Sequence, residues 1–517
     1  MSRKNRNVIE RWIIQGTLEL VTPTSLSNGD DDPLVDLPIV VDALEGVPLL
    51  TGASLGGALR AYVADYGDGY AEALFGGRKG NPEGGQSPLI VEDARGPVGE
   101  TPRIELRDGV SIDPATRTAK DEERYDRELL AAGTTFDLGF ELVIAEGSDG
   151  PQLRAALAAA LGGLQAGQIR LGGRKRRGYG QCQVTSWQAW RYKLTQAEHV
   201  AAWLAHGRPE LPGHQPPQWT WTAAEGGAGI GDWPALRDAA QLTPTARPFA
   251  LTATFDIDGA VLIRSGFETE SGPDATHLRS RRNGKDVPVL SGTSLAGVIR
   301  AQARRIAWTM AGQGNEAAAD ELVNGMFGQM EQPKRDTTPA DRRKLKKQAS
   351  RVMIDESVIE AGKKTGSPHD IVQTRVKIDR FTGGAFESAL FAEQPVFGGG
   401  FRLGLSLREP MVEKDEDSAV TEARRQAARA QMDAEVGLLL LVLKDLWTGF
   451  LPVGGSSSVG RGRLKGRAAT IVYGGQKWTL AAGQDGAGLT VTADDGTPAT
   501  TLNTYVTAFT NKVQGRG

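Results

Sequence analysis

Cysteine and histidine are scarce in this sequence. Cys182 is the one cysteine among 517 residues, which rules out a disulfide within the chain. The histidines are scattered, and their spacing is not that of a zinc site. We therefore expect neither a disulfide framework nor a structural metal to hold the fold together. The five histidines are His199, His206, His214, His277 and His369.

Long apolar runs are also missing. No stretch of about 18 apolar residues occurs, so we expect no membrane-spanning helix and no membrane partner. The N-terminal MSRKNRNVIERW has basic residues without an apolar segment behind them, which argues against a secretory signal and predicts a cytoplasmic protein. The net charge is −3 and 39% of the residues are hydrophobic, as in ordinary globular proteins. The length of 517 residues predicts about two to four domains.

What the sequence does contain is an internal repeat. The segment PLLTGASLGGALRA at 48–61 recurs as PVLSGTSLAGVIRA at 288–301, with eight of fourteen residues identical. Four further pairs of segments follow in the same order, which indicates two homologous halves. The pairs are LFGG at 74–77 and MFGQ at 326–329, SPLIVEDA at 87–94 and SRVMIDES at 350–357, GTTFDLGFEL at 133–142 and GGGFRLGLSL at 398–407, and GGRKRRGYG at 172–180 and GGSSSVGRG at 454–462.

Hydrophobic periodicity in the first half predicts strands and helices. Alternating apolar residues predict strands at 12–21, 134–144 and 182–190, and helical spacing predicts helices after the N-cap Ser54 and at 151–164. This order is typical of a ferredoxin-like domain, an antiparallel sheet with two helices on one face. We therefore predict an α+β protein of two tandem ferredoxin-like domains, with long irregular insertions at 77–132 and 329–395.

The repeat and the composition also predict the domain boundaries. The first domain covers 1–190 and the second covers 249–471. A linker region rich in Trp, Pro and Gly lies between them at 191–248, and a small C-terminal appendage with hairpin-like alternation follows at 472–517.

A glycine-rich loop stands near the end of each half. Glycines let a backbone approach another group closely with its N–H groups outward, and basic side chains beside them suit a phosphate. A solvated turn has the same composition, but recurrence in both halves favours phosphate binding, and two such loops suit a polynucleotide. The basic residues are Arg174, Lys175, Arg176 and Arg177 in the first half and Arg461, Arg463, Lys465 and Arg467 in the second.

Other charged clusters agree with a polyanionic partner. Basic residues gather at 279–285 and at 334–347, although the run around Lys344 also fits a solvated helix face. Acidic residues are concentrated elsewhere, at 30–32 and 413–417. The net charge therefore hides basic surfaces that can attract a phosphate backbone.

These segments together resemble the RAMP superfamily of CRISPR proteins, and more narrowly the backbone subunits of type III effector complexes. The resemblance rests on PLLTGASLGGALRA, SPLIVEDA and LGGRKRRGYGQCQV, and on TRVKIDRFTGGAFESALFAEQPV at 374–396, which is similar to the thumb of those subunits. The first-half counterpart of that thumb is the segment at 107–136. The likeness covers about 8–190 and 249–471, so it implies two backbone units fused in one chain, a type III-D-like arrangement.

The resemblance implies that the chain binds a guide RNA (crRNA) and a complementary target RNA beside other type III subunits. Ile112 and Ile378 are the implied thumb positions, expected to wedge into the guide–target duplex. The implied and pattern-based RNA-binding residues are Ser54, Arg60, Gly172, Gly173, Arg174, Lys175, Arg176 and Arg177 in the first half, and Ser294, Arg300, Gly454, Gly455, Ser456 and Arg461 in the second.

The resemblance also implies an endoribonuclease that cuts target RNA at fixed intervals through a loop aspartate before the helix motif. This position maps onto Asp36, and onto Asp274 if the second half has two extra residues. A carboxylate there can remove a proton or hold a divalent cation, Mg²⁺ or Mn²⁺. Asp42 and the acids at 30–32 are the fallbacks, and His277 is expected to be a solvent-facing loop residue that could assist proton transfer.

Two other functions stay open. The chain can be a guide-binding scaffold whose acids take no part in chemistry. It can also be a nuclease that processes guide precursors, although the histidine or lysine constellation for that reaction is not evident in the sequence.

Overall fold

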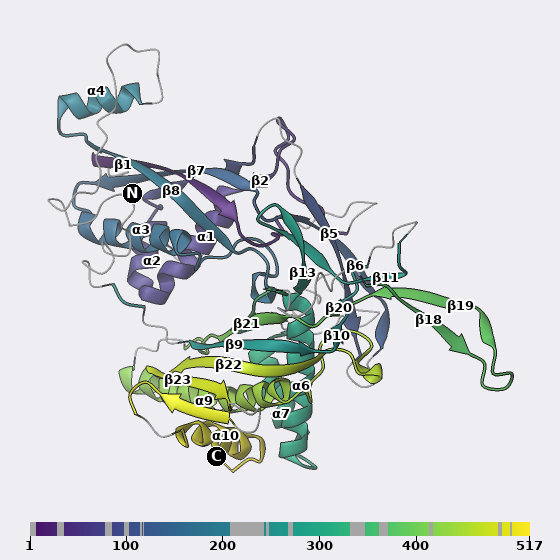
Figure 1. Cartoon of the computed structure of the whole chain (residues 1–517). Helices are drawn as coiled ribbons and strands as arrows, with labels where there is room; N and C mark the ends of the chain where they lie inside the picture. The colour runs from purple at the N-terminus through teal and green to yellow at the C-terminus, as the bar shows by residue number, and fades with distance from the viewer. Residues whose placement is uncertain are drawn as a thin grey trace, which may run out of the picture.

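The structure, a computed structural model, describes residues 7–27, 36–77, 85–97, 103–113, 116, 118–206, 242–244, 248–266, 272–330, 347–360, 371–412, 417–483, 489–496 and 499–516. These residues form helices and sheets in which most strand pairs are antiparallel, so the predicted α+β class is confirmed. Figure 1 shows the N-terminal half, purple to blue, beside the C-terminal half, teal to yellow.

A four-stranded sheet forms the centre of the first half. Its strands lie in the order β3, β7, β1, β8, and every neighbouring pair is antiparallel. Helices α1, α2 and α3 pack together on one face of this sheet (Figure 1). The elements are β1 (Val8–Leu20), α1 (Gly52–Val63), α2 (Asp68–Phe75), β3 (Leu89–Val91), β7 (Thr135–Ala145), α3 (Gly150–Gln165), β8 (Cys182–Lys193) and α4 (Ala197–Ala205).

The second half repeats this arrangement in a six-stranded sheet. Its order is β16, β21, β9, β22, β23, β24, and its first four strands follow the chain as those of the first sheet do. The elements are β9 (Phe249–Asp258), α6 (Gly292–Ala311), α7 (Glu316–Phe327), β16 (Val352–Ile354), β21 (Gly400–Leu407), α9 (Ser418–Trp447), β22 (Arg463–Tyr473), β23 (Gln476–Ala482), β24 (Leu489–Ala493) and α10 (Thr501–Val513).

Each sheet buries its own apolar cluster. Alternate residues of β1 such as Trp12 and Ile14 point into the first cluster, where the alanine- and leucine-rich α3 covers them. The second cluster runs from Phe249 to Val513, so β23 and α10 share it with β9 and α9. Trp478 and Phe509 of this C-terminal stretch are fully buried there. The two clusters explain why the repeat in the sequence becomes two packed units.

A long hairpin leaves each half. Strands β5 (Ile104–Ile112) and β6 (Ala119–Leu130) form the first, and β18 (Gln373–Ile378) and β19 (Ala385–Gln394) form the second. Figure 1 shows the second hairpin extending away from the sheets. The prediction of irregular insertions at 77–132 and 329–395 is therefore wrong for these segments, because cross-strand hydrogen bonds order a sequence whose charged residues hide strand alternation.

The predicted strands at 12–21, 134–144 and 182–190 and the helix at 151–164 are confirmed as β1, β7, β8 and α3, within a few residues at their ends. No helix among the described residues is long and apolar enough to cross a membrane. The acids at 30–32 and 413–416, the basic residues at 334–346 and most of the linker region, 207–241, lie outside the described residues.

Candidate nucleic-acid interface

The two glycine-rich loops have the same backbone conformation. Gly172 and Gly454 both have positive φ, +75° and +86°, and the loops then continue through a non-glycine residue in the left-handed region, Arg174 or Ser456. A side chain at Gly172 would place its Cβ 2.3 Å from the Ser25 carbonyl oxygen, so only glycine fits this close approach. Sequence similarity between the loops therefore reflects one shared shape.

Both loops are held against the segment that follows the first strand of their half. The N–H of Gly173 donates to the Ser25 carbonyl oxygen at 2.8 Å, and the N–H of Gly455 donates to that of Leu262 at the same distance. The loops therefore occupy equivalent positions beside their sheets.

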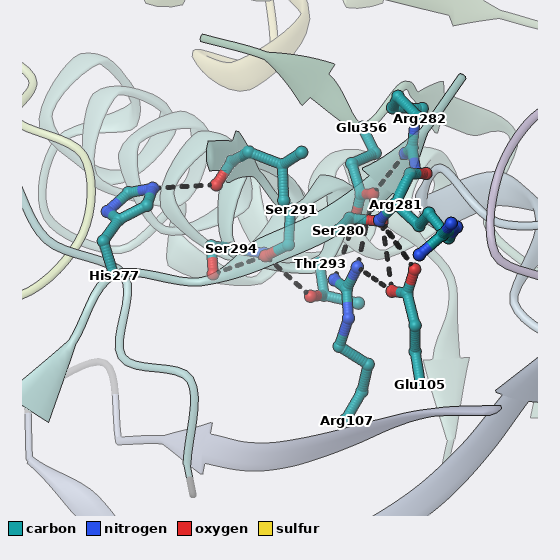
Figure 2. Close-up of polar contacts among 11 residues, drawn as sticks. Glu105, Arg107, His277, Ser280, Arg281, Arg282, Ser291, Thr293, Ser294 and Glu356 are labelled. Carbon is teal, nitrogen blue, oxygen red and sulfur yellow. Dashed lines mark hydrogen bonds and ion pairs between the residues drawn. The ribbon is translucent and has the colours of Figure 1, made fainter. Parts of the chain in front are cut away.

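The first helices of both halves begin near the first-half loop: Ser54 of α1 lines a pocket with Gly172, and a Cβ at Gly292 of α6 would lie 2.3 Å from the Arg177 carbonyl oxygen. Thr51 caps α1, because its Oγ1 accepts the N–H of Ser54 at 3.3 Å, and Ser291 caps α6 in the same way through Ser294. The prediction of Ser54 as the N-cap is therefore wrong, and Ser54 and Ser294 are third helical residues. Figure 2 shows the hydroxyl contact between Ser291 and Ser294.

The first-half helix and loop enclose a pocket of about 310 Å³. Ser54 lines it from α1, and Gly172, Gly173 and Lys175 line it from the loop. A helix N-terminus carries partial positive charge, and Lys175 adds a full one. Four predicted RNA-binding residues therefore line one hollow with room for a phosphate.

The basic side chains of the first loop crowd together. Burial, followed by the charges of Arg176 and Arg408, lowers the pKa of Lys175, and burial followed by Arg408 lowers that of Arg176. On β6, burial and then the charge of Arg174 lower the pKa of the buried Arg127. Like charges in a partly dehydrated site repel one another, so a bound polyanion would relieve this repulsion.

The positive cluster continues into the second half. Arg177 is exposed, and its charge, after burial, contributes to lowering the pKa of Arg300 on α6. Arg300 donates to Asn324 Oδ1 at 3.0 Å, a neutral partner. Arg60, the equivalent residue of α1, is half-buried. The basic loop of the first half and the helix of the second therefore form one surface.

The second loop differs in charge. Ser456 replaces Arg174, and the turn Ser457–Val459 has no basic side chain. Arg461 follows this turn but is buried, with an ion pair to Glu393 at 2.8 Å and a hydrogen bond to Gln373 at 2.9 Å. The structure therefore places Arg461 inside the base of the second hairpin, away from the surface of the loop.

Asp36 and Asp274 lie at equivalent positions, each at the side of a hairpin. Asp36 Oδ2 accepts the backbone N–H of Asp126 in β6 at 2.8 Å, and Asp274 Oδ2 accepts that of Ala392 in β19 at 2.6 Å. Both aspartates are near the surface. The structure thus gives equivalent positions in the two halves to Asp36 and Asp274, which the sequence could align only by assuming an insertion.

That insertion has a defined place. In the first half Val41 pairs with Pro48 across a short turn, and in the second Arg279 pairs with Pro288 across the longer β12–β13 turn, formed by β12 (Arg279–Arg282) and β13 (Lys285–Leu290). The two extra residues lie in this turn, after Asp274.

The fallback candidates have structural contacts. Asp42 Oδ1 accepts the N–H groups of Leu44 at 3.0 Å and Glu45 at 2.9 Å, and these bonds lower its pKa. His277 is buried: Nδ1 accepts the N–H of Ile263 at 3.2 Å, and Nε2 lies 3.0 Å from the Val289 carbonyl oxygen. The expectation of a solvent-facing His277 is therefore wrong, because both ring nitrogens contact backbone groups. Figure 2 shows one of these two contacts.

Ile112 and Ile378 occupy matching hairpin positions. Each follows a register shift, after Val110 in β5 and after Val376 in β18, and pairs with an alanine on the partner strand. They are 53% and 55% exposed, so both present apolar surface to solvent. Exposed apolar side chains on an extended hairpin indicate a contact surface.

A buried ion network joins the halves and was not predicted. Arg107 of β5 is bonded to Glu356 of the second half at 3.0 Å and to Glu105 at 2.8 Å, and Arg282 reaches Glu356 at 2.6 Å (Figure 2). Burial alone would lower the pKa of Arg107, but Glu356, with Glu105, raises it. No sequence signal links residues so far apart, although Glu356 lies in the repeated SRVMIDES segment.

The aspartates fit a divalent cation only in part. The described residues contain no group of three His, Cys, Asp or Glu side chains that could hold a metal. Mg²⁺ is commonly bound by one or two carboxylates together with substrate phosphates. Asp36 or Asp274 could therefore hold a cation shared with a bound RNA.

Comparison with protein families gives one match. The model of the RAMP superfamily matches residues 17–183 and 252–465, which together make up most of the chain. The two regions coincide with the two halves, and each includes the whole glycine-rich loop of its half. No curated protein matches the chain.

Proposed function

The chain belongs to the RAMP superfamily, with one RAMP domain in each half, and on that premise we propose that it is a double backbone subunit of a type III CRISPR effector complex. RAMP proteins bind RNA and act in CRISPR-associated complexes, and the superfamily includes endoribonucleases. In this proposal the chain binds the guide RNA and cuts complementary target RNA beside Asp36 and Asp274. The order of strands in each sheet supports a ferredoxin-like fold for both domains.

Guide binding is assigned to the first-half loop and the helix N-termini. The pocket at Ser54, Gly172 and Lys175 offers a helix N-terminus and a cation to a phosphate, and Arg177 and Arg300 extend the positive surface across the junction. Because a sugar-phosphate chain carries regular charges, a surface that runs over both halves suits it better than a mononucleotide. The Trp-rich linker at 191–248 takes no part in this proposal.

The two hairpins are assigned the role of thumbs. Ile112 and Ile378 are exposed at equivalent positions, so each can insert apolar surface between stacked base pairs. Regular spacing of the hairpins along a duplex would expose the target at regular intervals. Asp36 and Asp274 are bonded to the hairpins themselves, which would place a carboxylate beside each exposed position.

The proposed cleavage uses the target's own ribose. The 2′-hydroxyl loses its proton as its oxygen bonds to phosphorus, the bond from phosphorus to the 5′-oxygen breaks, and that oxygen takes a proton from water. The carboxylate of Asp36 or Asp274 accepts the 2′-hydroxyl proton or helps to hold a Mg²⁺ or Mn²⁺ ion. Such an ion, when bound, would neutralise charge on the scissile phosphate.

The single observation that carries this proposal is the equivalence of Asp36 and Asp274 at the hairpins. It is tested by purifying the complex from its natural host and sequencing the bound RNA. We expect guide-sized RNA with a repeat-derived end, together with other type III subunits. A complex without RNA, or with RNA of random origin, would contradict the proposal.

A scaffold without catalysis is the second candidate, favoured by the structural contacts of Asp36 with Asp126 and of Asp274 with Ala392. The double variant Asp36→Ala and Asp274→Ala in the assembled complex separates the two. Loss of defined target fragments with the guide still bound supports cleavage. An unchanged fragment pattern supports the scaffold.

A further inference from the structure

An arginine of the glycine-rich loop is stacked on a tyrosine of the first hairpin. The guanidinium carbon of Arg174 lies 4.4 Å from the ring centre of Tyr125, and Nη1 donates to the Tyr125 hydroxyl. Tyr125 itself lies over Gly109 of β5, where a Cβ would come within 2.1 Å of the ring. The ring is therefore fixed on the hairpin, and Arg174 is fixed on the ring.

The next two residues of β6 contact the rest of the site. The N–H of Asp126 holds Asp36, and Arg127 Nη1 donates to Ser25 Oγ at 2.8 Å. Ser25 is the residue whose carbonyl oxygen holds the loop at Gly173. Three consecutive residues of β6 thus make these contacts: Tyr125 binds the loop, Asp126 binds Asp36, and Arg127 binds Ser25.

The second half lacks this stack. At the position equivalent to Tyr125 stands Phe391, which is 39% exposed, and at the position equivalent to Arg174 stands Ser456. Asp274 is still held by the N–H of the following residue, Ala392. The aspartate contact is therefore common to both halves, whereas the link from strand to loop belongs to the first alone.

We propose that Tyr125 is a positioning residue that locks the guide-binding loop to the strand holding Asp36. If the loop could shift on its own, the distance between the guide phosphate and the Asp36 carboxylate would vary. Small displacements of reacting groups reduce the rate by large factors. The Tyr125 contact holds the loop, and the Asp126 N–H holds Asp36, to the same strand, β6. This inference rests on the proposed function for its catalytic consequence, but the lock itself can be measured without RNA.

The first test uses the assembled complex and target RNA. Tyr125→Ala is expected to lower the product assigned to Asp36 about tenfold relative to the product assigned to Asp274, whereas Tyr125→Phe, which keeps the ring, stays within about threefold. Trp203→Ala is the matched control. Trp203 lies in α4, away from the site, and the guanidinium carbon of Arg11 in β1 lies 4.5 Å from the centre of its ring. An unchanged product ratio in Tyr125→Ala, or equal loss of both products, would overturn the inference.

The second test uses the free chain and trypsin, which cuts after Lys and Arg. Cleavage within 174–177, followed by mass spectrometry, is expected to be about tenfold faster in Tyr125→Ala than in the wild type or Trp203→Ala. Arg174→Lys keeps the charge without the planar stack, so it should also speed cleavage after Lys175. Equal rates in all variants would overturn the lock. A wild-type complex that cuts no RNA but shows this protection contradicts the proposed function and leaves the lock supported.

Discussion

The Asp274 carboxylate accepts a hydrogen bond from the backbone N–H of Ala392 at 2.6 Å. The same bond from Asp126 to Asp36 in the other half shows that the two aspartates share one geometry. A backbone donor fixes the position of a carboxylate oxygen while the second oxygen can face a ligand. Equivalent geometry predicts equivalent chemistry, so both halves should cut target RNA.

Each aspartate should control its own product. Asp36→Ala and Asp274→Ala are each expected to reduce one set of target fragments by about 100-fold or more, because positioned acid–base groups contribute factors of that size. Gel analysis of end-labelled target measures this. Asp42→Ala is the control, since the contacts of the Asp42 side chain among the described residues are with its own turn and Arg95. If Asp274→Ala removes no fragment, only the first half is catalytic.

The basic loop should determine the salt dependence of guide binding. Lys175→Ala and Arg176→Ala are each expected to reduce the slope of log affinity against log salt by about 0.7, the value for one phosphate contact to a single strand. Titration of guide RNA at several salt concentrations gives the slope. Lys477→Ala is the control, because Lys477 lies on β23 and pairs with Asp494. A slope that stays constant in the loop variants argues against phosphate contacts there.

Local patterns in the sequence predicted much of this structure. The repeat aligned the loops and helices because the same backbone shape needs the same glycines, as Gly172 and Gly454 show. Strands with one buried face, such as β1, were visible through alternation. The N-cap was misplaced because Thr51 and Ser54 are both hydroxyl residues within one turn, and only the bond direction distinguishes them.

Contacts between distant residues could not be predicted in this way. Arg107 and Glu356 are 249 positions apart, and nothing in either segment indicates the other. His277 looks like a loop residue, but its burial depends on the backbone of Ile263 and Val289, which only the fold brings together. The Tyr125 and Arg174 stack is of the same kind.

The single thiol should be unreactive in the folded chain. Burial raises the pKa of Cys182 to about 12, so the folded state keeps the proton at pH values where an unfolded thiol ionises. A thiol reagent at pH 9 should therefore react slowly with native protein and rapidly in urea. Because the pKa of Cys182 is higher in the folded chain than in the unfolded chain, the contribution of this thiol to the free energy of unfolding falls as the pH rises toward 12. Cys182→Ala provides the blank, and rapid reaction of native protein would contradict the burial.

The junction between the halves should depend on its buried charges. Arg107→Met removes one of the two arginines that pair with the buried Glu356, so one negative charge of the network is no longer balanced. We expect the free energy of unfolding to fall by about 3 kcal/mol, the lower end of the range for breaking a buried pair. Arg425→Ala breaks an exposed pair with Glu422 and should cost about 0–1 kcal/mol. Urea denaturation followed by tryptophan fluorescence measures both.

A double variant then separates loss of attraction from a stranded charge at this junction. In Arg107→Met with Glu356→Leu neither charge remains buried there, so much of the lost stability should return if desolvation dominates. Arg282 would lose its partner as well, but it is less deeply buried than Arg107 and can reach water. A double variant as unstable as Arg107→Met alone would mean that the shape of the ion network, and not the unpaired charge, holds the two RAMP domains together.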